Sequence, residues 1–400
     1  MKKRLVPCLL ILAAILSNVC LADMRVVYPV SKIGPRVPVF LTTTTKKTTT
    51  TKKSTTTTKM TSTTQAMPPA AVLFWQTMGN GLKGQVSKII ATPAGKIYAA
   101  GYYNDASGYH CYLASFQNNS WNYIGEGNNA ISDMACDPSS NTLYLTGSFT
   151  SIGGLSIKKI VKCLPDAGYW APVGPGVFTN NFGRLFFDTK ASALYAITKD
   201  SAGVAQIMKW QNEGWTTFGS TLSNYQIGAF TVNPVTGVPY IAGSCLFKWN
   251  GQDWGKLTGS YFNNDAYALA FDNSGNTLYI GGMMGIVGTG GGMSSVGKWE
   301  SNNLSALPPI GGPTYCLAVD PATNTLITGG SFTQISSTNQ TNRIAKYVNG
   351  AWQAIGKGFN NDVYTIAFDP DGNVIAGGNF IQSMENIKLN YIGKLPKYLK

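Results

Sequence analysis

Histidine, the side chain that most often acts as a general acid or base, occurs once in this chain of 400 residues, at His110. A Ser-His-Asp arrangement would have to use His110, and no GxSxG motif precedes it. Paired carboxylates can hydrolyse glycosidic bonds without histidine, and Asp133, Asp265 and Asp362 are the candidates for that chemistry. An enzyme acting on polysaccharide is therefore kept as the alternative function, and no catalytic residue is assigned.

Two short motifs that could hold a cofactor or a metal lack the necessary context. GNGLKG, from Gly79 to Gly84, matches the GxGxxG pattern, but a dinucleotide site needs a helix after it, and here another strand follows. DPDGN, from Asp369, resembles the start of a calcium loop, but the twelfth position needs a carboxylate and is Phe380. A type I turn capped by Asp369 explains this motif better. No cofactor and no metal are predicted.

Five cysteines follow the first twenty-two residues, and none has the close spacing of a zinc site. They are Cys111, Cys136, Cys163, Cys245 and Cys316. Their scatter and odd number argue against a disulfide framework. Small buried side chains within strands are the favoured interpretation, and one or two disulfides remain the alternative.

Residues 1–22 have the organisation of a secretory signal peptide: a basic start, an apolar middle and a small residue, Ala22, at the end. We expect cleavage after Ala22. A lipid anchor on Cys20 is the alternative, although Val19 is bulkier than such sites normally accept. No later segment is apolar over the length that spans a membrane. The basic start is typical of bacteria, so the protein is expected to be extracellular or in a bacterial periplasm or cell envelope.

Residues 23–70 are predicted to be a disordered, Thr/Lys-rich linker, because residues 42–66 are almost entirely Thr, Ser and Lys. Contact of this segment with an anionic envelope polymer is the alternative. The formal charge of +13 is concentrated at this end of the chain: residues 2–4 contribute +3 and residues 23–70 contribute +7. Residues 71–400 hold 20 basic and 17 acidic side chains, which leaves +3. A nucleic-acid site needs a basic patch on the folded part, so no such partner is predicted.

From Phe74 onward the chain repeats one pattern at spacings of 39 to 51 residues. Each repeat has a first strand that ends in a turn residue and a second strand that ends in small residues. A third strand and a tight turn lead to a fourth strand, which opens with an aromatic residue in most repeats. The residues that close the first strands are Thr92, Asp137, Asp188, Asn233, Asp272, Asp320 and Asp369.

The number of strands predicts the architecture. Seven first, second and third strands occur, but a fourth strand follows only six of them, because the chain ends soon after Leu395. The missing strand lies at the other end, in FWQTMG from Phe74. The sequence therefore predicts an all-β, seven-bladed β-propeller over residues 71–400, whose N-terminal strand completes the last blade and leaves no open edge.

Glycine pairs such as Gly329-Gly330, with aromatic pairs such as Tyr347/Trp352 downstream, make residues 74–400 similar to the kelch repeat. This repeat is shared with the central propeller of galactose oxidase, and the chain also resembles secreted bacterial proteins with AKW…G…W…LG repeats. The resemblance implies a propeller without the copper site of the oxidase, which needs two histidines. The glycine pair is reduced in three blades and absent from AITKD, so blades 3 and 4 are expected to be less regular.

Alternating strand direction assigns the connections to two faces of the ring. First-to-second and third-to-fourth turns share one face, the turn face, and second-to-third and fourth-to-first connections share the other, the loop face. Turns on the turn face are short. Three second-to-third connections are long, over residues 102–110, 283–293 and 331–342. Recognition is placed on the loop face, because loops on a rigid scaffold commonly carry binding residues.

Asn, Asp and Tyr side chains gather around the predicted centre of the loop face, where they suit hydrogen bonding to sugar hydroxyls or to a polar peptide surface. Taken singly, each Asn or Asp is equally consistent with a turn former. The predicted ligand-binding residues are Asn128, Asn129, Asp133, Asn180, Asn181, Tyr225, Tyr261, Asn263, Asn264, Asp265, Asn360, Asn361 and Asp362. The predicted function is a secreted or envelope-associated, monomeric binding module for a protein or glycan.

Limited proteolysis tests this division of the chain. Protease should remove residues 23–70 and leave a resistant fragment spanning residues 74–400, because each blade of a closed ring is supported on both sides. Mass spectrometry of the digest identifies the fragment. Two or more stable pieces within residues 74–400 would contradict a single closed ring.

Overall fold

The computed structural model describes residues 74–157, 159–174, 181–262, 265–283, 285, 295–335 and 341–397. All of them belong to one compact unit, Pro68–Lys400. The predicted signal peptide and linker lie outside the described residues, as do Asn180, Asn263 and Asn264 of the predicted site.

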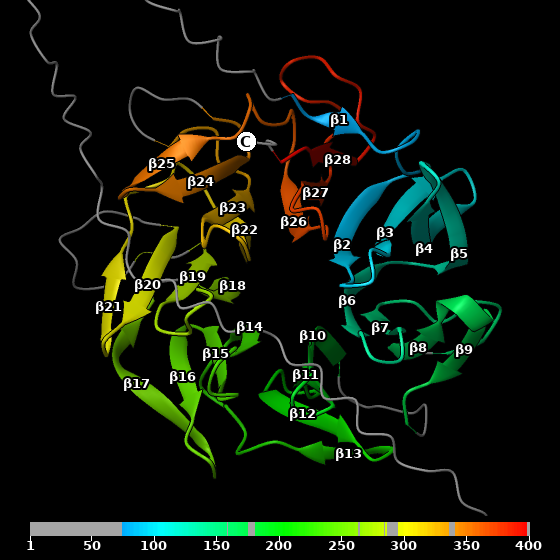
Figure 1. Cartoon of the computed structure of the whole chain (residues 1–400). Coiled ribbons are helices and arrows are strands. Elements are labelled where there is room, and N and C mark those ends of the chain that lie inside the picture. The colour runs from blue at the N-terminus through cyan, green and yellow to red at the C-terminus, as the bar shows by residue number, and fades with distance from the viewer. Residues whose placement is uncertain are drawn as a thin grey trace, which may run out of the picture. The chain divides into compact units, whose positions relative to one another are not determined.

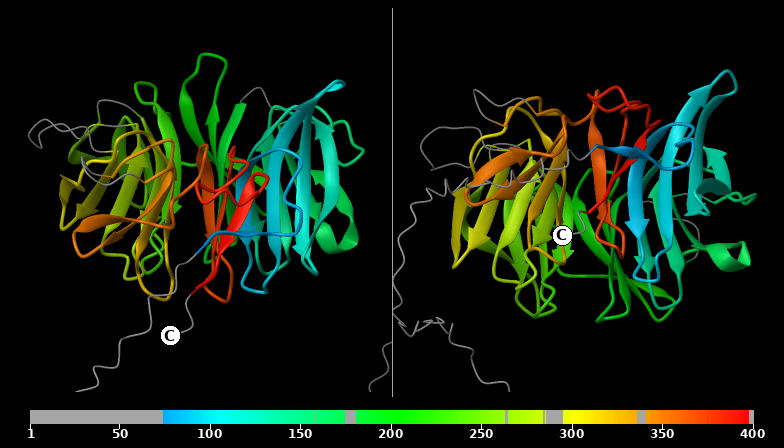
Figure 2. Two further views of the ribbon diagram at one scale, coloured as in Figure 1. Left: turned by 90° about the horizontal axis from the view of Figure 1, so that it is seen from above. Right: turned by 45° about the horizontal axis from the view of Figure 1, so that its top comes forward.

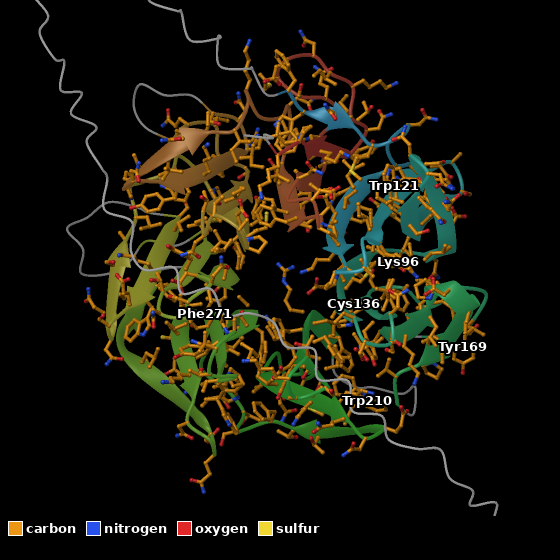
Figure 3. All side chains as sticks on the ribbon, in the orientation of Figure 1. Lys96, Trp121, Cys136, Tyr169, Trp210 and Phe271 are labelled. Atoms are coloured by element: carbon orange, nitrogen blue, oxygen red, sulfur yellow. The ribbon has the colours of Figure 1, made fainter. Side chains whose placement is uncertain are left out.

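Seven four-stranded antiparallel sheets are arranged as blades around a common centre (Figure 1). Blade 1 is β2-β3-β4-β5, and blades 2 to 6 continue in chain order, whereas blade 7 has the order β26-β27-β28-β1. Figure 3 shows Cys136 and Phe271, on first strands, closer to the centre than Tyr169, on a fourth strand. The predicted seven-bladed, all-β propeller is confirmed.

The first strands line the centre, and each is followed outward by the other three strands of its blade. The first strands are β2 (Gln85–Ala91), β6 (Ile131–Asp137), β10 (Asn181–Asp188), β14 (Ile227–Val232), β18 (Ala266–Phe271), β22 (Thr314–Val319) and β26 (Val363–Phe368). The second strands are β3 (Ile97–Asp105), β7 (Thr142–Gly147), β11 (Ala193–Lys199), β15 (Pro239–Gly243), β19 (Leu278–Gly282), β23 (Leu326–Gly330) and β27 (Val374–Gly378).

The outer half of each blade consists of the third and fourth strands. The third strands are β4 (Gly108–Gln117), β8 (Ile160–Leu164), β12 (Ala205–Gln211), β16 (Cys245–Trp249), β20 (Val296–Glu300), β24 (Ile344–Val348) and β28 (Ile392–Leu395). The fourth strands are β5 (Ser120–Asn128), β9 (Tyr169–Pro172), β13 (Gly214–Thr217), β17 (Trp254–Tyr261), β21 (Asn303–Ala306), β25 (Ala351–Ala354) and β1 (Gln76–Thr77). A single 3-10 turn, η1 (Pro165–Ala167), joins β8 to β9.

The N-terminal strand closes the ring as predicted. Gln76 and Thr77 of β1 pair antiparallel with Lys394 and Gly393 of β28, which would otherwise be an open edge. Trp75, immediately before β1, is fully buried, and its ring centroid lies 4.5 Å from that of Phe359. The strand is short, so much of its contribution comes from this buried indole.

A tryptophan on the fourth strand links each of several blades to the blade before it. In four blades the indole nitrogen donates a hydrogen bond to a backbone carbonyl just after the preceding fourth strand. The pairs are Trp121 to Met78, 3.0 Å, Trp215 to Val173, 3.0 Å, Trp254 to Phe218, 2.9 Å, and Trp352 to Pro308, 2.8 Å. Trp75 makes the same bond to Ile355 at 3.4 Å, so the N-terminal strand is held as the fourth strands of those four blades are.

Glycine pairs at the ends of second strands allow two close approaches. A Cβ on Gly329 would lie 2.6 Å from Val363 of the next blade, and one on Gly330 would lie 2.0 Å from the Pro313 carbonyl oxygen of its own blade. The expected irregularity of blades 3 and 4 does not distinguish them from the other blades. Blade 4 has an additional register shift between Cys245 and Phe247, but blade 1 has one between Leu113 and Ala114, and blade 3 has only the shift that all blades share.

The connection predicted as a long loop over residues 102–110 is instead a β-hairpin. β3 continues to Asp105, and β4 begins at Gly108, so only Ala106 and Ser107 form the turn. The Asn, Asp, Ser and Gly residues there indicated a loop, but they lie at the exposed tip of two long paired strands. The β3–β4 hairpin and the β11–β12 loop project from the same face of the ring (Figure 2). No helix in the described part of the chain is long and apolar enough to cross a membrane.

Deletion of residues 71–82 tests the closure of the ring. The deletion removes β1 and Trp75, and loss of a buried tryptophan costs roughly 3–5 kcal/mol. We expect a melting temperature several degrees lower and reduced solubility, measured against a matched deletion of residues 23–70. Equal melting temperatures for the two deletions would contradict a stabilising role for β1.

Candidate functional site

Every first strand has a β-bulge near its loop-face end. In each blade the register of pairing with the second strand skips one residue of the first strand. The skipped residues are Ser87, Ser132, Gly183, Gly228, Tyr267, Tyr315 and Tyr364. A bulge redirects the side chain at the extra position, and all of these residues except Gly183 line the cavities at the centre of the ring.

Three of the bulge residues form an arc of tyrosines over blades 5, 6 and 7. The ring centroids of Tyr267 and Tyr315 are 6.3 Å apart, and those of Tyr315 and Tyr364 are 5.5 Å apart. In blades 1 to 4 the equivalent residues are Ser or Gly. We call Tyr267, Tyr315 and Tyr364 the tyrosine arc. The centre of the ring is therefore aromatic on one side and lined by small residues on the other.

A cavity of about 360 Å³ opens at the loop-face end of the centre, and we call it the channel mouth. Its described lining residues are Gln85, Ser87, Ser132, Arg184, Tyr267, Met283, Pro313, Tyr315 and Tyr364. A second cavity of about 230 Å³ lies between the first strands of all seven blades. Ser87, Arg184 and the tyrosine arc line both cavities. The mouth volume falls within the range of roughly 300–1,000 Å³ that is usual for small-molecule sites.

Asp133 lies in the channel, but protein groups occupy its carboxylate. One oxygen lies 3.2 Å from the ammonium nitrogen of Lys88 in blade 1 and accepts a hydrogen bond from the Met134 amide at 2.9 Å. The other oxygen accepts a hydrogen bond from the Leu185 amide of blade 3 at 3.0 Å. Only 2 % of the Asp133 side chain is exposed. Asp133 therefore joins three blades and has little capacity left for a ligand.

Two tyrosines of the arc have raised pKa values. Burial and the nearby Asp362 carboxylate raise the pKa of Tyr364 to about 12. Burial and the charge of Asp265 likewise raise the pKa of Tyr267. The Tyr364 hydroxyl is hydrogen-bonded to Asp362, whereas Tyr267 and Tyr315 can each offer a hydroxyl and an apolar face.

Two asparagines of the predicted site hold loops in place. Asn128 Oδ1 accepts hydrogen bonds from the Thr150 and Ser151 amides, at 2.8 and 3.0 Å. Asn360 Oδ1 makes the equivalent bonds to the Ile381 and Gln382 amides, at 3.0 and 3.3 Å. Both side chains tie a fourth-to-first connection to the neighbouring second-to-third loop. These hydrogen bonds agree with the alternative that Asn128 and Asn360 stabilise loops rather than bind a ligand.

The remaining described residues of the predicted site are also engaged in local structure. Asn129 has a φ of 58°, and its backbone N–H donates a hydrogen bond to the Tyr109 carbonyl oxygen at 2.9 Å. Asn361 Oδ1 accepts from the Asp362 amide at 2.9 Å. The ring of Tyr225 packs edge-on against Phe247, with centroids 4.9 Å apart.

The two remaining carboxylates of the predicted set differ in their partners. Asp362 lies 3.2 Å from the guanidinium of Arg343. Asp265 is half-buried and close enough to Tyr267 to shift its pKa. Asn181 begins β10 and Tyr261 ends β17, so both lie at the loop-face ends of their strands.

Sequence reasoning missed the tyrosine arc, Lys88 and Arg184. A signal for the arc is present, because AYALAF, TYCLAV and VYTIAF carry Tyr at one position in three consecutive repeats. A tyrosine in a strand is ordinarily attributed to β propensity and packing, so the recurrence was not interpreted as a site.

His110 does not form a nucleophilic triad. It lies in β4 opposite Tyr103. Ser107 Oγ and Asp105 Oδ1 both approach the same imidazole nitrogen, Nε2, at 2.9 and 3.2 Å. A triad requires the carboxylate on the other ring nitrogen. These bonds close the hairpin turn. No group of three His, Cys, Asp or Glu residues that could hold a metal occurs within the described ranges.

Comparison with known proteins supports the fold. No family model matches the chain, and no curated protein is significantly similar to it in sequence. Among solved structures, the WD40 β-propeller domain of Doa1 is similar, with a TM-score of 0.58 and 12% identity, over 82% of this chain and 98% of that domain. The extracellular domain of BT4673 from B. thetaiotaomicron, described as a hybrid two-component system, has a TM-score of 0.55 and 14% identity. That match covers 81% of this chain and 40% of the other.

Both comparisons establish a β-propeller, which is the class of protein that the seven sheets define. Sequence identities of 12% and 14% extend no further than the fold.

Thiol labelling tests the burial of the five cysteines within the described residues, which are free thiols in the structure. Burial raises the pKa of Cys111, Cys163 and Cys316 to about 12. Because the thiolate is the reactive form, these three should resist iodoacetamide at pH 8 in the native protein and react after denaturation in guanidinium. Rapid labelling of the native protein, or a cysteine that stays unlabelled after denaturation without reductant, would contradict buried free thiols.

Proposed function

We propose that this propeller is an exported binding module that recognises a protein or a glycan through its loop face. The observation that carries the proposal is the channel mouth, a cavity of about 360 Å³ lined by the tyrosine arc and opening on that face. Concave sites with aromatic walls and a few polar groups are the usual form of ligand sites in proteins. The seven-bladed scaffold holds the mouth rigid, so binding requires little reordering.

Exposed apolar side chains on the loop face support the same assignment. Five large hydrophobic residues in or beside second-to-third connections are between 38% and 58% exposed. They are Tyr109, Leu155, Met283, Ile381 and Met384. On the turn face the corresponding residues within the described chain are Phe74, Tyr169 and Val235. Apolar groups left in water on one face are typical of an interaction surface.

The enzyme alternative has less support. Glycoside hydrolysis needs two carboxylates that flank the substrate. Asp133 is paired with Lys88 and Asp362 with Arg343, so two of the three candidate carboxylates are occupied by protein cations. Asp265 alone cannot supply both an acid and a base or nucleophile.

Two parts of this proposal depend on the sequence: export, and the similarity of the repeats to the kelch repeat. The apolar segment ending at Ala22 is the basis for a signal peptide and a bacterial source. A structurally similar propeller that is an extracellular domain is consistent with export. We further propose a monomer, which leaves the loop face free for the partner.

A glycan and protein array probed with the mature chain tests the proposed function. Replacing Tyr315 by Ala should weaken binding to any ligand found by about tenfold or more, with little change in melting temperature, because Tyr315 faces the mouth. Asp371→Ser, in an exposed turn on the opposite face, should bind as the parent does. Loss of binding in Asp371→Ser, with binding retained in Tyr315→Ala, would indicate recognition on the turn face and contradict the proposal.

A further inference from the structure

We propose that the channel mouth takes a uronic acid unit of an anionic glycan, with its carboxylate on Arg184 and its ring against the tyrosine arc. This inference rests on the proposed function and specifies the ligand class for the same site. Four observations carry it: an uncommitted arginine, the charge of the channel, the shape of the mouth and the polarity of its lining.

Arg184 differs from the only other arginine of the propeller, Arg343. The guanidinium of Arg343 lies 3.2 Å from Asp362 and also donates to the Ser331 carbonyl. Arg184 follows the bulge residue Gly183 on β10 and lines both the mouth and the deeper cavity. Within the described residues, no hydrogen bond or ion pair joins its side chain to another group. A planar guanidinium that projects into a cavity without a protein partner suits a carboxylate, which it can bind through two parallel hydrogen bonds.

The charge of the channel favours an anion. Lys88, Arg184 and Asp133 are the charged residues among the described lining of the deeper cavity, which gives two cations and one carboxylate, or +1. Lys88 and Asp133 neutralise each other at 3.2 Å, so the excess charge is that of Arg184. Asp265 opposes an anion at the rim, near Tyr267. Removing the negative charge of Asp265 should therefore strengthen the binding of an anion.

The shape of the mouth suits one sugar ring. Tyr267, Tyr315 and Tyr364 provide a curved aromatic wall, and Ser87 and Ser132 on the other side leave the space in front of it open. A pyranose presents apolar C–H groups on its faces and hydroxyls at its edge. The faces can lie against the tyrosine rings, and the hydroxyls can bond to tyrosine and serine hydroxyls.

The polarity of the lining favours a glycan over a peptide. Of the described residues at the mouth, only Met283 and Pro313 have purely apolar side chains. The hydroxyl, amide and guanidinium groups of the other residues match the hydroxyl-rich edge of a sugar more closely than an aliphatic peptide side chain. A peptide with a C-terminal carboxylate is therefore treated as an outcome of the test.

Calorimetry with the mature chain tests the proposal. The probes are tetrasaccharides of galacturonate, glucuronate and mannuronate, each compared with its methyl ester, which keeps the rings and removes the charge. At least one acid should bind, its ester should bind about tenfold or more weakly, and the affinity should fall with added salt. If no acid binds, or if the ester binds as well as the acid, the proposal is overturned.

Variants identify the residues. Arg184→Gln should weaken binding of the acid by about tenfold or more and have little effect on the ester. Asp265→Asn should strengthen binding of the acid. Lys346→Gln, on the third strand of blade 6, removes the same charge outside the cavity lining and is the matched control. Circular dichroism melts establish that each variant is folded. Equal losses in Arg184→Gln and Lys346→Gln would overturn the role of Arg184.

The outcome also separates this inference from the proposed function. If array ligands are neutral glycans or proteins, and Tyr315→Ala abolishes their binding while Arg184→Gln does not, the loop-face module stands and the uronate site fails. Tighter binding of a peptide with a free C-terminal carboxylate than of any uronate likewise overturns the glycan assignment. If the array yields no ligand and no uronate binds, both proposals fail.

Discussion

The hydrogen bond from a fourth-strand indole to the preceding blade is the interaction on which the ring depends. Each such bond fixes one blade against the one before it, and Trp75 extends the series across the point where the chain begins and ends. Blade 5 has Leu304 at this position and blade 2 has Trp170, whose ring packs closely against Gly125 of blade 1. These contacts join neighbouring blades on the outside of the ring, while the first strands of the same blades line the channel at its centre.

Most of the fold could be predicted, because its determinants are local and repeat seven times. The alternation of the strands, the turns that follow Asp or Asn, and the unmatched FWQTMG segment were sufficient to predict seven blades and the closing strand. The error over residues 102–110 has a physical origin. Turn-forming residues such as Asn104 and Asp105 normally end strands, but here β3 and β4 pair as far as Asp105 and Gly108. Pairing with a long partner strand outweighed the local preference.

The candidate site was less predictable, because it depends on backbone geometry that composition does not reveal. Asparagines at the strand ends indicated a polar rim, yet Asn128 and Asn360 use their side-chain oxygens to hold neighbouring loops. A bulge adds one residue to a strand and changes which side chain turns toward the channel. The alternation of residues along β22 does not by itself show that Tyr315 lines the channel, because the bulge changes the alternation at that position. The sequence therefore located Asn and Asp residues at the strand ends, whereas the residues that line the centre required the structure.

In each repeat, the residues that hold the blade in place differ from the bulge residue that lines the centre. This explains why the centre can differ between blades. Glycine at the end of the second strand allows a close backbone approach beside the bulge, as the 2.0 Å approach of a Cβ on Gly330 to the Pro313 oxygen illustrates, although blade 3 has its bulge opposite Thr198 and Ile197. The tryptophan of the fourth strand positions the blade from outside. The bulge residue itself has no pairing partner and supports neither contact, so Ser, Gly or Tyr can occupy it without changing the fold. Three tyrosines on one side and small residues on the other then give a symmetric scaffold an asymmetric cavity. Such asymmetry is what a scaffold of equivalent blades requires to bind a ligand in one orientation.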